Sequence, residues 1–348
     1  MKITNLSKLT LIAVFVLGML GLQGCHIIKT VTFWPIEPTG SVHPIGNSAG
    51  EFQQYGDPPY FHRGDDIMGA PAPGGPNIIA VRPGVPAVSL CGPACLYNGV
   101  TMAIADGSNY VYWHLNQASI PQAVRDADNA NTPIAAGAVL GRLVVWPGGY
   151  HHLHYQIATA GGVNEEPQWT LNGALTDTTP PTIDNIFFAV NGTNTTFPTD
   201  AFGRPVVNGN VDIIVQAYDR QFGATFSGLT LRVGVFDIQY RIFRLLTVPV
   251  LVQTGPLIRF DSIPGNANAS ILYRNSPPFD SDSNYLGIEN YYYVVTNADA
   301  AATSFSEAFA WNTAALPDGL YVVEITARDP SFNLTTLSRI VVVDNVPP

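Results

Sequence analysis

Charged side chains are scarce in this chain of 348 residues. Asp, Glu, Lys and Arg together make up 12% of the residues, against about 25% in an average soluble protein. The 16 basic residues are outnumbered by 26 acidic ones, which gives a formal net charge of −10. This balance leaves no basic patch for a phosphate backbone, so the composition argues against nucleic acid as a partner.

Cysteine is also rare, with three residues, whereas glycine and proline are abundant. The chain has 32 Gly, 28 Pro and 11% aromatic residues. This profile favours loop-rich β domains over helical bundles or disorder. A chain of this length can form two domains of ordinary size, each with its own core. We therefore expect an all-β protein with two domains.

The N-terminus has the pattern of a targeting segment. Lys2 and Lys8 precede an apolar run over 9–22 that is short for a bilayer span. Residues 22–25 read Leu-Gln-Gly-Cys and resemble a bacterial lipobox, in which Cys25 would be lipidated and become the new N-terminus. The alternative is an ordinary cleaved signal peptide with an incidental cysteine.

A lipidated Cys25 would hold the protein on a membrane surface without spanning the membrane. His26, rather than Asp, follows the cysteine, which by resemblance implies the outer membrane. We therefore expect a lipoprotein signal peptide at 1–24 and an anchor with a linker at 25–40. The mature protein would lie in the cell envelope and face the periplasm.

The other two cysteines, Cys91 and Cys95, flank a Gly-Pro-Ala segment. In an exported protein such a close pair is more typical of a small disulfide loop than of a metal site. The Gly-Pro dipeptide suits the tight turn that a bridge needs. We expect a Cys91–Cys95 disulfide, with free thiols as the alternative.

Five of the seven histidines lie in three short segments, and two of these segments have informative spacing. His62 and Asp66 are four residues apart, and Gly64 between them would let the backbone turn sharply. His152 and His154 are two apart in a β-type sequence, so they would share one face of a strand while His151 faces away. The third segment, a strand-like run, ends with His114.

In this order, the three segments resemble the lysostaphin/LytM-type zinc endopeptidases of bacterial cell walls. The pattern of that family is His-x-Gly-x-Asp after an aromatic residue, then Tyr-x-His-Leu, then His-Leu-His before an aromatic residue. The chain reads Phe-His-Arg-Gly-Asp-Asp at 61–66, Tyr-Trp-His-Leu at 112–115 and His-Leu-His-Tyr at 152–155. The resemblance covers residues 41–165 and implies a zinc metalloendopeptidase domain at 41–175.

The resemblance also implies a role for each matching residue. His62, Asp66 and His154 would ligate zinc, and His114 and His152 would be catalytic histidines that do not bind the metal. The chain departs from the usual pattern at two positions near these motifs, Asp65 and Gln156. Neither departure removes a ligand, so they bear on substrate fit more than on metal binding.

This ligand set implies a definite chemistry. Two imidazoles and one carboxylate leave Zn²⁺ one position for water, as in catalytic rather than structural zinc sites. Zinc lowers the pKa of such a water from about 15.7 to about 7. No Glu in the motif can act as general base, so His114 and His152 must share proton transfer and oxyanion stabilisation. We expect hydrolysis of peptide bonds in peptidoglycan cross-links.

The second half of the chain carries no catalytic cluster. Asp177–Pro181 form a proline-stiffened junction, after which strand-like runs recur. Residues 316–329 resemble the last hairpin of bacterial immunoglobulin-like modules. We expect an immunoglobulin-like β-sandwich at 176–348, with 244–290 as a long insertion. The expected strands are 183–190, 211–218, 231–243, 291–295, 320–328 and 337–344.

Several alternatives stay open. The second half would be a spacer that separates the enzyme from its anchor or partner. Alternatively, it would bind a glycan or an envelope protein through exposed tyrosines at 291–293. The whole chain could also be a catalytically silent scaffold that binds peptidoglycan or a partner, and segment 41–60 or the Cys91–Cys95 loop could cover the site.

Residues 280–284 look like the start of a calcium loop, but Tyr285 replaces the required glycine, which favours a solvated acidic turn.

Overall fold

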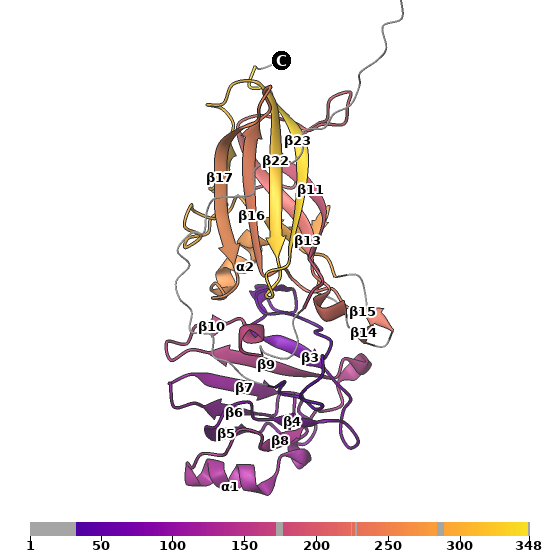
Figure 1. Ribbon diagram of the computed structural model, residues 1–348, viewed down its shortest axis with the longest axis vertical. Helices are drawn as coiled ribbons and strands as arrows, with labels where there is room; N and C mark the ends of the chain where they lie inside the picture. Colours follow the sequence, from indigo (N-terminus) through magenta and orange to yellow (C-terminus); the bar gives the residue numbers. More distant parts are fainter. Residues whose placement is uncertain (1–32, 172–176, 224, 227, 284–288, 347–348) are drawn as a thin grey trace, which may run out of the picture.

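The computed structural model describes residues 33–171, 177–223, 225–226, 228–283 and 289–346. Strands account for 42% of the residues and helices for 9%, which confirms the all-β prediction. The two β-rich halves are stacked along the long axis of the molecule (Figure 1). The predicted signal peptide and Cys25 lie outside the described residues. Within the part of the chain that the structure describes, no helix has the length and apolar character needed to cross a bilayer.

An antiparallel six-stranded sheet forms the centre of the first half (Figure 1). Its strands are β10 (Asn164–Glu165), β9 (His152–Ala158), β7 (Asn109–Trp113), β6 (Gly99–Ala103) and β5 (Val85–Ser89) in spatial order, with β3 (Asp65–Met68) also paired to β9. Smaller elements surround it, namely the pairs β1 (Phe52–Gln53) with β2 (Tyr60–Phe61) and β4 (Asn77–Ile79) with β8 (Val139–Arg142), and helix α1 (Gln122–Ala130).

The register of this sheet positions the predicted ligands. Strand β9 lies between β3 and β7, and His154 is directly opposite Asp66 on one side and Trp113 on the other. The alternation predicted for β9 is confirmed, since His152 and His154 line one cavity whereas Leu153 between them packs into the core. Two ligands therefore sit on neighbouring strands that the sequence separates by more than eighty residues.

Gly64 is needed for a different reason from the sharp turn that the sequence predicted. Its φ angle does not lie in the left-handed region, and instead the backbone passes very close to β9. A Cβ atom at Gly64 would collide with the carbonyl oxygen of Tyr155. Glycine is needed here for close approach between His62 and Asp66, not for a turn.

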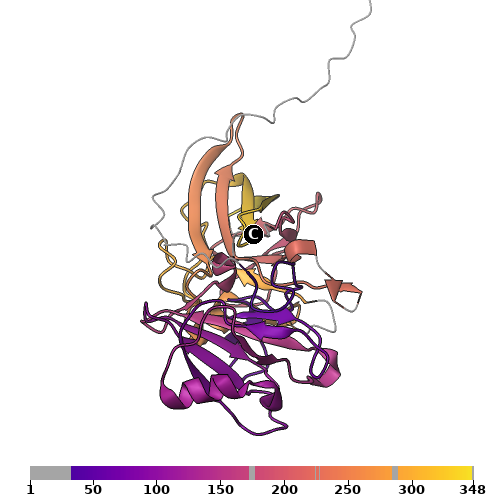
Figure 2. The ribbon, with the colours of Figure 1, turned by 60° about the horizontal axis from the view of Figure 1, so that its bottom comes forward.

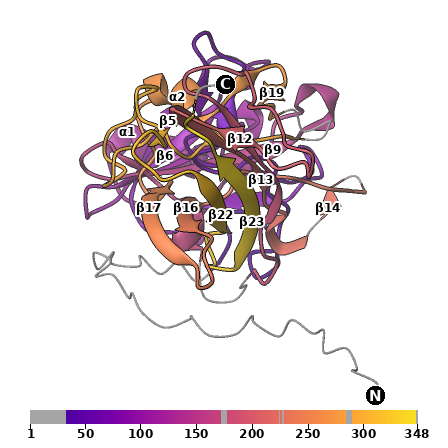
Figure 3. The same cartoon turned by 90° about the horizontal axis from the view of Figure 1, so that it is seen from above.

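The second half is a sandwich of two sheets (Figure 3). One contains β11 (Thr182–Val190), β13 (Asn210–Tyr218), β20 (Tyr292–Val294) and β21 (Trp311–Asn312). The other contains β12 (Val206–Val207), β23 (Leu334–Val343), β22 (Gly319–Arg328), β16 (Asp237–Arg244) and β17 (Val250–Arg259). Alternate residues of both sheets, such as Ile186 and Val215 on one and Ile238 and Ile325 on the other, pack into one core.

Three expectations for the second half were wrong. The run 231–243 becomes a strand only from Asp237, and segment 244–290 is not a simple insertion because β17 pairs along β16. Tyr291 and Tyr293 are 0% and 1% exposed, so they do not form a binding face. They are buried because their rings point into the sandwich core, where Tyr293 packs against Tyr273. Asp282 of the acidic turn accepts a hydrogen bond from Gln54 of the first half.

The two halves are joined by packing as well as by the chain (Figure 2). Phe52 and Phe61 of the first half belong to the core of the sandwich, where Phe61 meets Phe260 at 6.0 Å between ring centroids. Conversely, Val233 of the second half packs into the core of the first. Trp34 also lies in that first core, so the described end of the predicted 25–40 linker is part of the first domain.

Candidate metal centre

Three predicted ligand atoms converge on one buried point. His62 Nε2 lies 3.2 Å from Asp66 Oδ1 and 3.0 Å from His154 Nδ1, and His154 Nδ1 lies 3.1 Å from the same Asp66 oxygen. A tetrahedral ion with bonds of about 2.0–2.1 Å separates its ligand atoms by about 3.3 Å. This buried group could therefore hold a metal ion.

Hydrogen bonds at the far side of each ring set the protonation of the two histidine ligands. His62 Nδ1 lies 3.1 Å from the carbonyl oxygen of Ser48, which can only accept, so Nδ1 carries a proton and Nε2 is the ring nitrogen that faces the centre. His154 Nε2 lies 3.3 Å from Gln156 Oε1, which leaves Nδ1 for the centre in the same way. Gln156, a departure from the family pattern, thus acts as the orienting group of a ligand.

The two predicted catalytic histidines lie beside this triangle. The rings of His114 and His152 are 4.6 Å apart between centroids. His114 Nδ1 donates to the carbonyl oxygen of Leu96 at 2.8 Å, and His152 Nδ1 donates to that of Tyr150 at 2.7 Å. Both rings therefore present an unprotonated Nε2 towards the site, and that of His152 lies 3.5 Å from Asp66 Oδ2.

Burial and neighbouring charges shift the pKa values of these side chains in different directions. Burial, and next the neighbouring His152, lower the pKa of His114 to about 3, and burial also lowers the pKa of His152. Burial disfavours the Asp66 carboxylate, but His152 and His62 outweigh it and hold the Asp66 pKa well below its usual value. His114 and His152 are therefore neutral proton acceptors at neutral pH, beside an ionised Asp66.

Aromatic side chains form the walls around the histidines. Trp113 stacks on His154, and Trp146 lies 4.6 Å from His114 and 4.8 Å from His152 between ring centroids. Together with other groups these residues line a cavity of about 710 Å³. Segment 41–60 contributes to its wall through Asn47, Gln53 and Tyr55, and Asn266 comes from the second half.

Sequence reasoning missed most of these wall residues. Trp113 lies inside a motif segment and Tyr150 lies two residues before another, so their positions were a usable signal. The hydroxyl of Tyr150 donates to Asn47 Oδ1 and lies 3.5 Å from Asp66 Oδ2. Trp146 and Asn266 carried no such signal, because only the tertiary fold brings them to the cavity.

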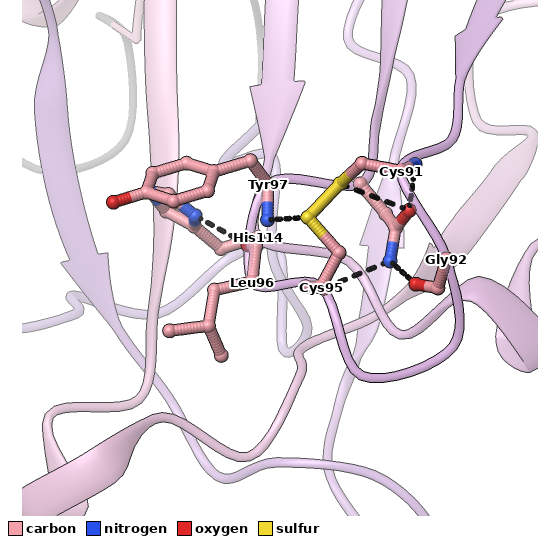
Figure 4. The surroundings of a disulfide bond; sticks show 7 residues. Cys91, Gly92, Cys95, Leu96, Tyr97 and His114 are labelled. Carbon is pink, nitrogen blue, oxygen red and sulfur yellow. Dashed lines mark hydrogen bonds between the residues drawn. A yellow bond between two sulfur atoms is a disulfide. The ribbon is translucent and has the colours of Figure 1, made fainter.

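The predicted disulfide between Cys91 and Cys95 is present. Figure 4 shows its loop beside His114, with the Leu96 carbonyl facing the histidine ring. The side chain of Asn98 ties the loop together by donating to the carbonyl oxygens of Gly92 and Cys95 and accepting from the Cys91 amide. The loop thus supports the carbonyl that orients His114.

The roles predicted from the sequence imply that removal of this disulfide impairs catalysis more than metal binding. In the Cys91→Ser/Cys95→Ser variant, the denatured chain gains about 2 kcal/mol of loop entropy, and the Leu96 carbonyl is no longer held against His114. We expect a fall in hydrolytic rate of about tenfold with unchanged metal content. Rate and metal content measured on the same sample test this, and a parallel loss of metal would contradict it.

No protein-family model matches the chain, and no curated protein is similar to it at a significant level. The candidate centre therefore stands on the motifs and the geometry of this chain's own residues.

Proposed function

We propose that this chain is a zinc-dependent endopeptidase that hydrolyses peptide bonds in peptidoglycan cross-links. The observation that carries the proposal is the convergence of three possible ligand atoms, from His62, Asp66 and His154, beside the side chains of His114 and His152. Two imidazoles and one carboxylate match catalytic zinc sites, which keep a position open, whereas structural sites use four protein ligands. Among the described residues, no fourth His, Cys, Asp or Glu joins this group.

When bound, zinc supplies Lewis acidity, which polarises a carbonyl group and acidifies water. The proton transfers fall to His114 and His152. Each can accept a proton on Nε2 while its Nδ1–H stays hydrogen-bonded to a backbone carbonyl oxygen, and each can then deliver the accepted proton to the leaving amine. A protonated Nε2 also becomes a donor that stabilises negative charge on the substrate oxygen. The Asp66 carboxylate would stabilise an imidazolium at His152, 3.5 Å away.

The walls of the cavity support a peptide substrate. Trp113, Trp146 and Tyr97 offer flat surfaces on which an extended chain can pack, with the histidines between them. The cavity is large enough for several residues of a peptide. Peptidoglycan cross-links are the peptide class implied by the LytM resemblance of the motifs.

The finer architecture and the location belong to the same proposal. We assign residues 41–175 to a LytM-type peptidase domain, supported by ligands placed on adjacent antiparallel strands, β3 and β9. Residues 176–348 would be an immunoglobulin-like module, supported by the two-sheet sandwich. The lipobox pattern at Cys25 supports a lipid-anchored protein on the periplasmic face of the outer membrane.

Purified peptidoglycan sacculi provide the direct test. We expect the zinc-loaded mature protein to release soluble muropeptides, and we expect chelation to stop the release and added Zn²⁺ to restore it. The measurement is chromatography of the released fragments. Tight binding to sacculi without release, in zinc-loaded protein, would reject the hydrolase and favour the scaffold that binds peptidoglycan or an envelope partner.

A further inference from the structure

Three buried aspartates meet at the junction between the two halves. Asp177 lies in the junction before β11, Asp219 directly follows β13, and Asp329 directly follows β22. Each offers a carboxylate oxygen within 4.8 Å of the others, and the three residues are 3%, 0% and 0% exposed. In Figure 1, β22 ends at the face of the sandwich that adjoins the first half. None of the three aspartates lines the cavity of the metal centre, and the two groups share no residue.

The hydrogen bonds of these carboxylates leave two oxygen atoms unused. Asp177 Oδ1 accepts from the Thr179 amide, and Asp219 Oδ1 accepts from the Arg220 amide. Asp177 Oδ2 and Asp219 Oδ2 are fully buried and have no hydrogen-bond partner in the described part of the chain. A buried carboxylate oxygen without a partner is costly, so its presence points to a missing ligand.

Two other buried aspartates of the second half are neutralised by arginine. Asp212 pairs with Arg274, and Asp237 pairs with both Arg259 and Arg328. Across the residues that the structure describes, no arginine forms an ion pair with any member of the three-aspartate cluster. Lysine cannot serve either, because the last lysine of the chain is at position 29.

The electrostatic environment agrees with this picture. Burial, followed by the carboxylates of Asp329 and Asp177, raises the pKa of Asp219 well above its usual value. The positive charge of Arg220 opposes this rise in the pKa of Asp219, but among the described residues its guanidinium forms no ion pair with the cluster and lies 4.8 Å from the centre of the Tyr218 ring. Three carboxylates therefore share a small buried space without a protein cation paired to any of them.

We propose that Asp177, Asp219 and Asp329 bind a calcium ion that fastens the junction between the two halves. The donors are all carboxylate oxygens, without nitrogen or sulfur, which suits a hard cation rather than zinc. Ca²⁺ accepts six to eight oxygens in flexible geometry, so water and backbone carbonyls can complete its shell. The ion would tie the junction to the ends of β13 and β22, one from each sheet. This inference goes beyond the proposed hydrolysis and does not depend on it.

Calcium titration of the zinc-loaded full mature chain tests the site. We expect one Ca²⁺ to bind by calorimetry, and we expect saturating CaCl₂ to raise the melting temperature by about 5 °C, because the ion binds only the folded state. Asp219→Asn should weaken the binding at least tenfold and remove the shift. Asp280→Asn, which alters an exposed aspartate on β19 (Phe279–Asp280), should bind as the unmodified chain does.

Melting temperatures measured without calcium separate a residue that binds the ion from a residue that only supports the fold. Asp219→Asn removes one of three repelling carboxylates, so without calcium it should melt at or above the temperature of the unmodified chain. If this variant does not fold, Asp177→Asn gives the same comparison. Failure of the unmodified chain to bind Ca²⁺ at millimolar concentration, or binding of Mg²⁺ instead, would overturn the proposal. Unchanged calcium affinity in Asp219→Asn would also overturn it.

Discussion

His154→Ala is expected to lose both the metal and the hydrolytic activity, whereas His114→Ala keeps the metal and loses only the activity. His154 contributes one of three converging ligand atoms, 3.0 Å from His62 Nε2 and 3.1 Å from Asp66 Oδ1. His114 lines the same cavity but is not one of the three residues that could hold the metal. Loss of a positioned proton-transfer group lowers rates by about 10²–10⁴. Elemental analysis and muropeptide release on the same samples measure both effects.

His151→Ala serves as the matched control for this pair. His151 precedes the same strand, but it is partly exposed and does not line the cavity. It accepts a hydrogen bond from the Trp146 amide, so a small loss of rate with full metal content is the expected result. Full hydrolysis by the His114 variant, or full metal content in the His154 variant, would refute the assignment of roles.

Phe260→Ala is expected to destabilise both halves of the protein together. Phe260 is fully buried and packs against Phe61 of the first half and Tyr273 of the second. Truncation of a buried phenylalanine costs about 3–5 kcal/mol because it leaves a cavity. Since the cavity would open in a core shared by both halves, we expect one cooperative transition at lower denaturant. Urea unfolding followed by fluorescence and by circular dichroism measures it.

Phe202→Ala provides the comparison, because Phe202 is 81% exposed on a loop of the sandwich. A surface truncation of this kind changes the free energy of unfolding by about 0.5 kcal/mol or less. Two separate transitions in the Phe260 variant, with only the second displaced, would show that the halves unfold independently. That result would favour the spacer interpretation of the second half.

Patterns within single segments were enough to predict the shared face of two histidines, one disulfide and the β-rich fold class. The alternation of His152, Leu153 and His154 was enough to place both histidines on one face, because successive residues of a strand point to opposite sides. The four-residue separation of Cys91 and Cys95 likewise sufficed to predict their disulfide. The low charge and the Gly and Pro content predicted a β protein. These are local or compositional properties, and the rest of the fold does not alter them.

Tertiary structure decided which of these segments meet. The pairing of β3 with β9 sets Asp66 opposite His154, and the carbonyl oxygens of Ser48 and Leu96 orient two histidines from loops that no motif marks. Tyr293, which the sequence pattern allowed at the surface, is buried because its ring faces the core between the two sheets. The aspartates at the junction come together only because the fold brings the end of β13 close to the end of β22. Such contacts depend on the register between strands far apart in the chain, and a pattern confined to one strand does not specify that register.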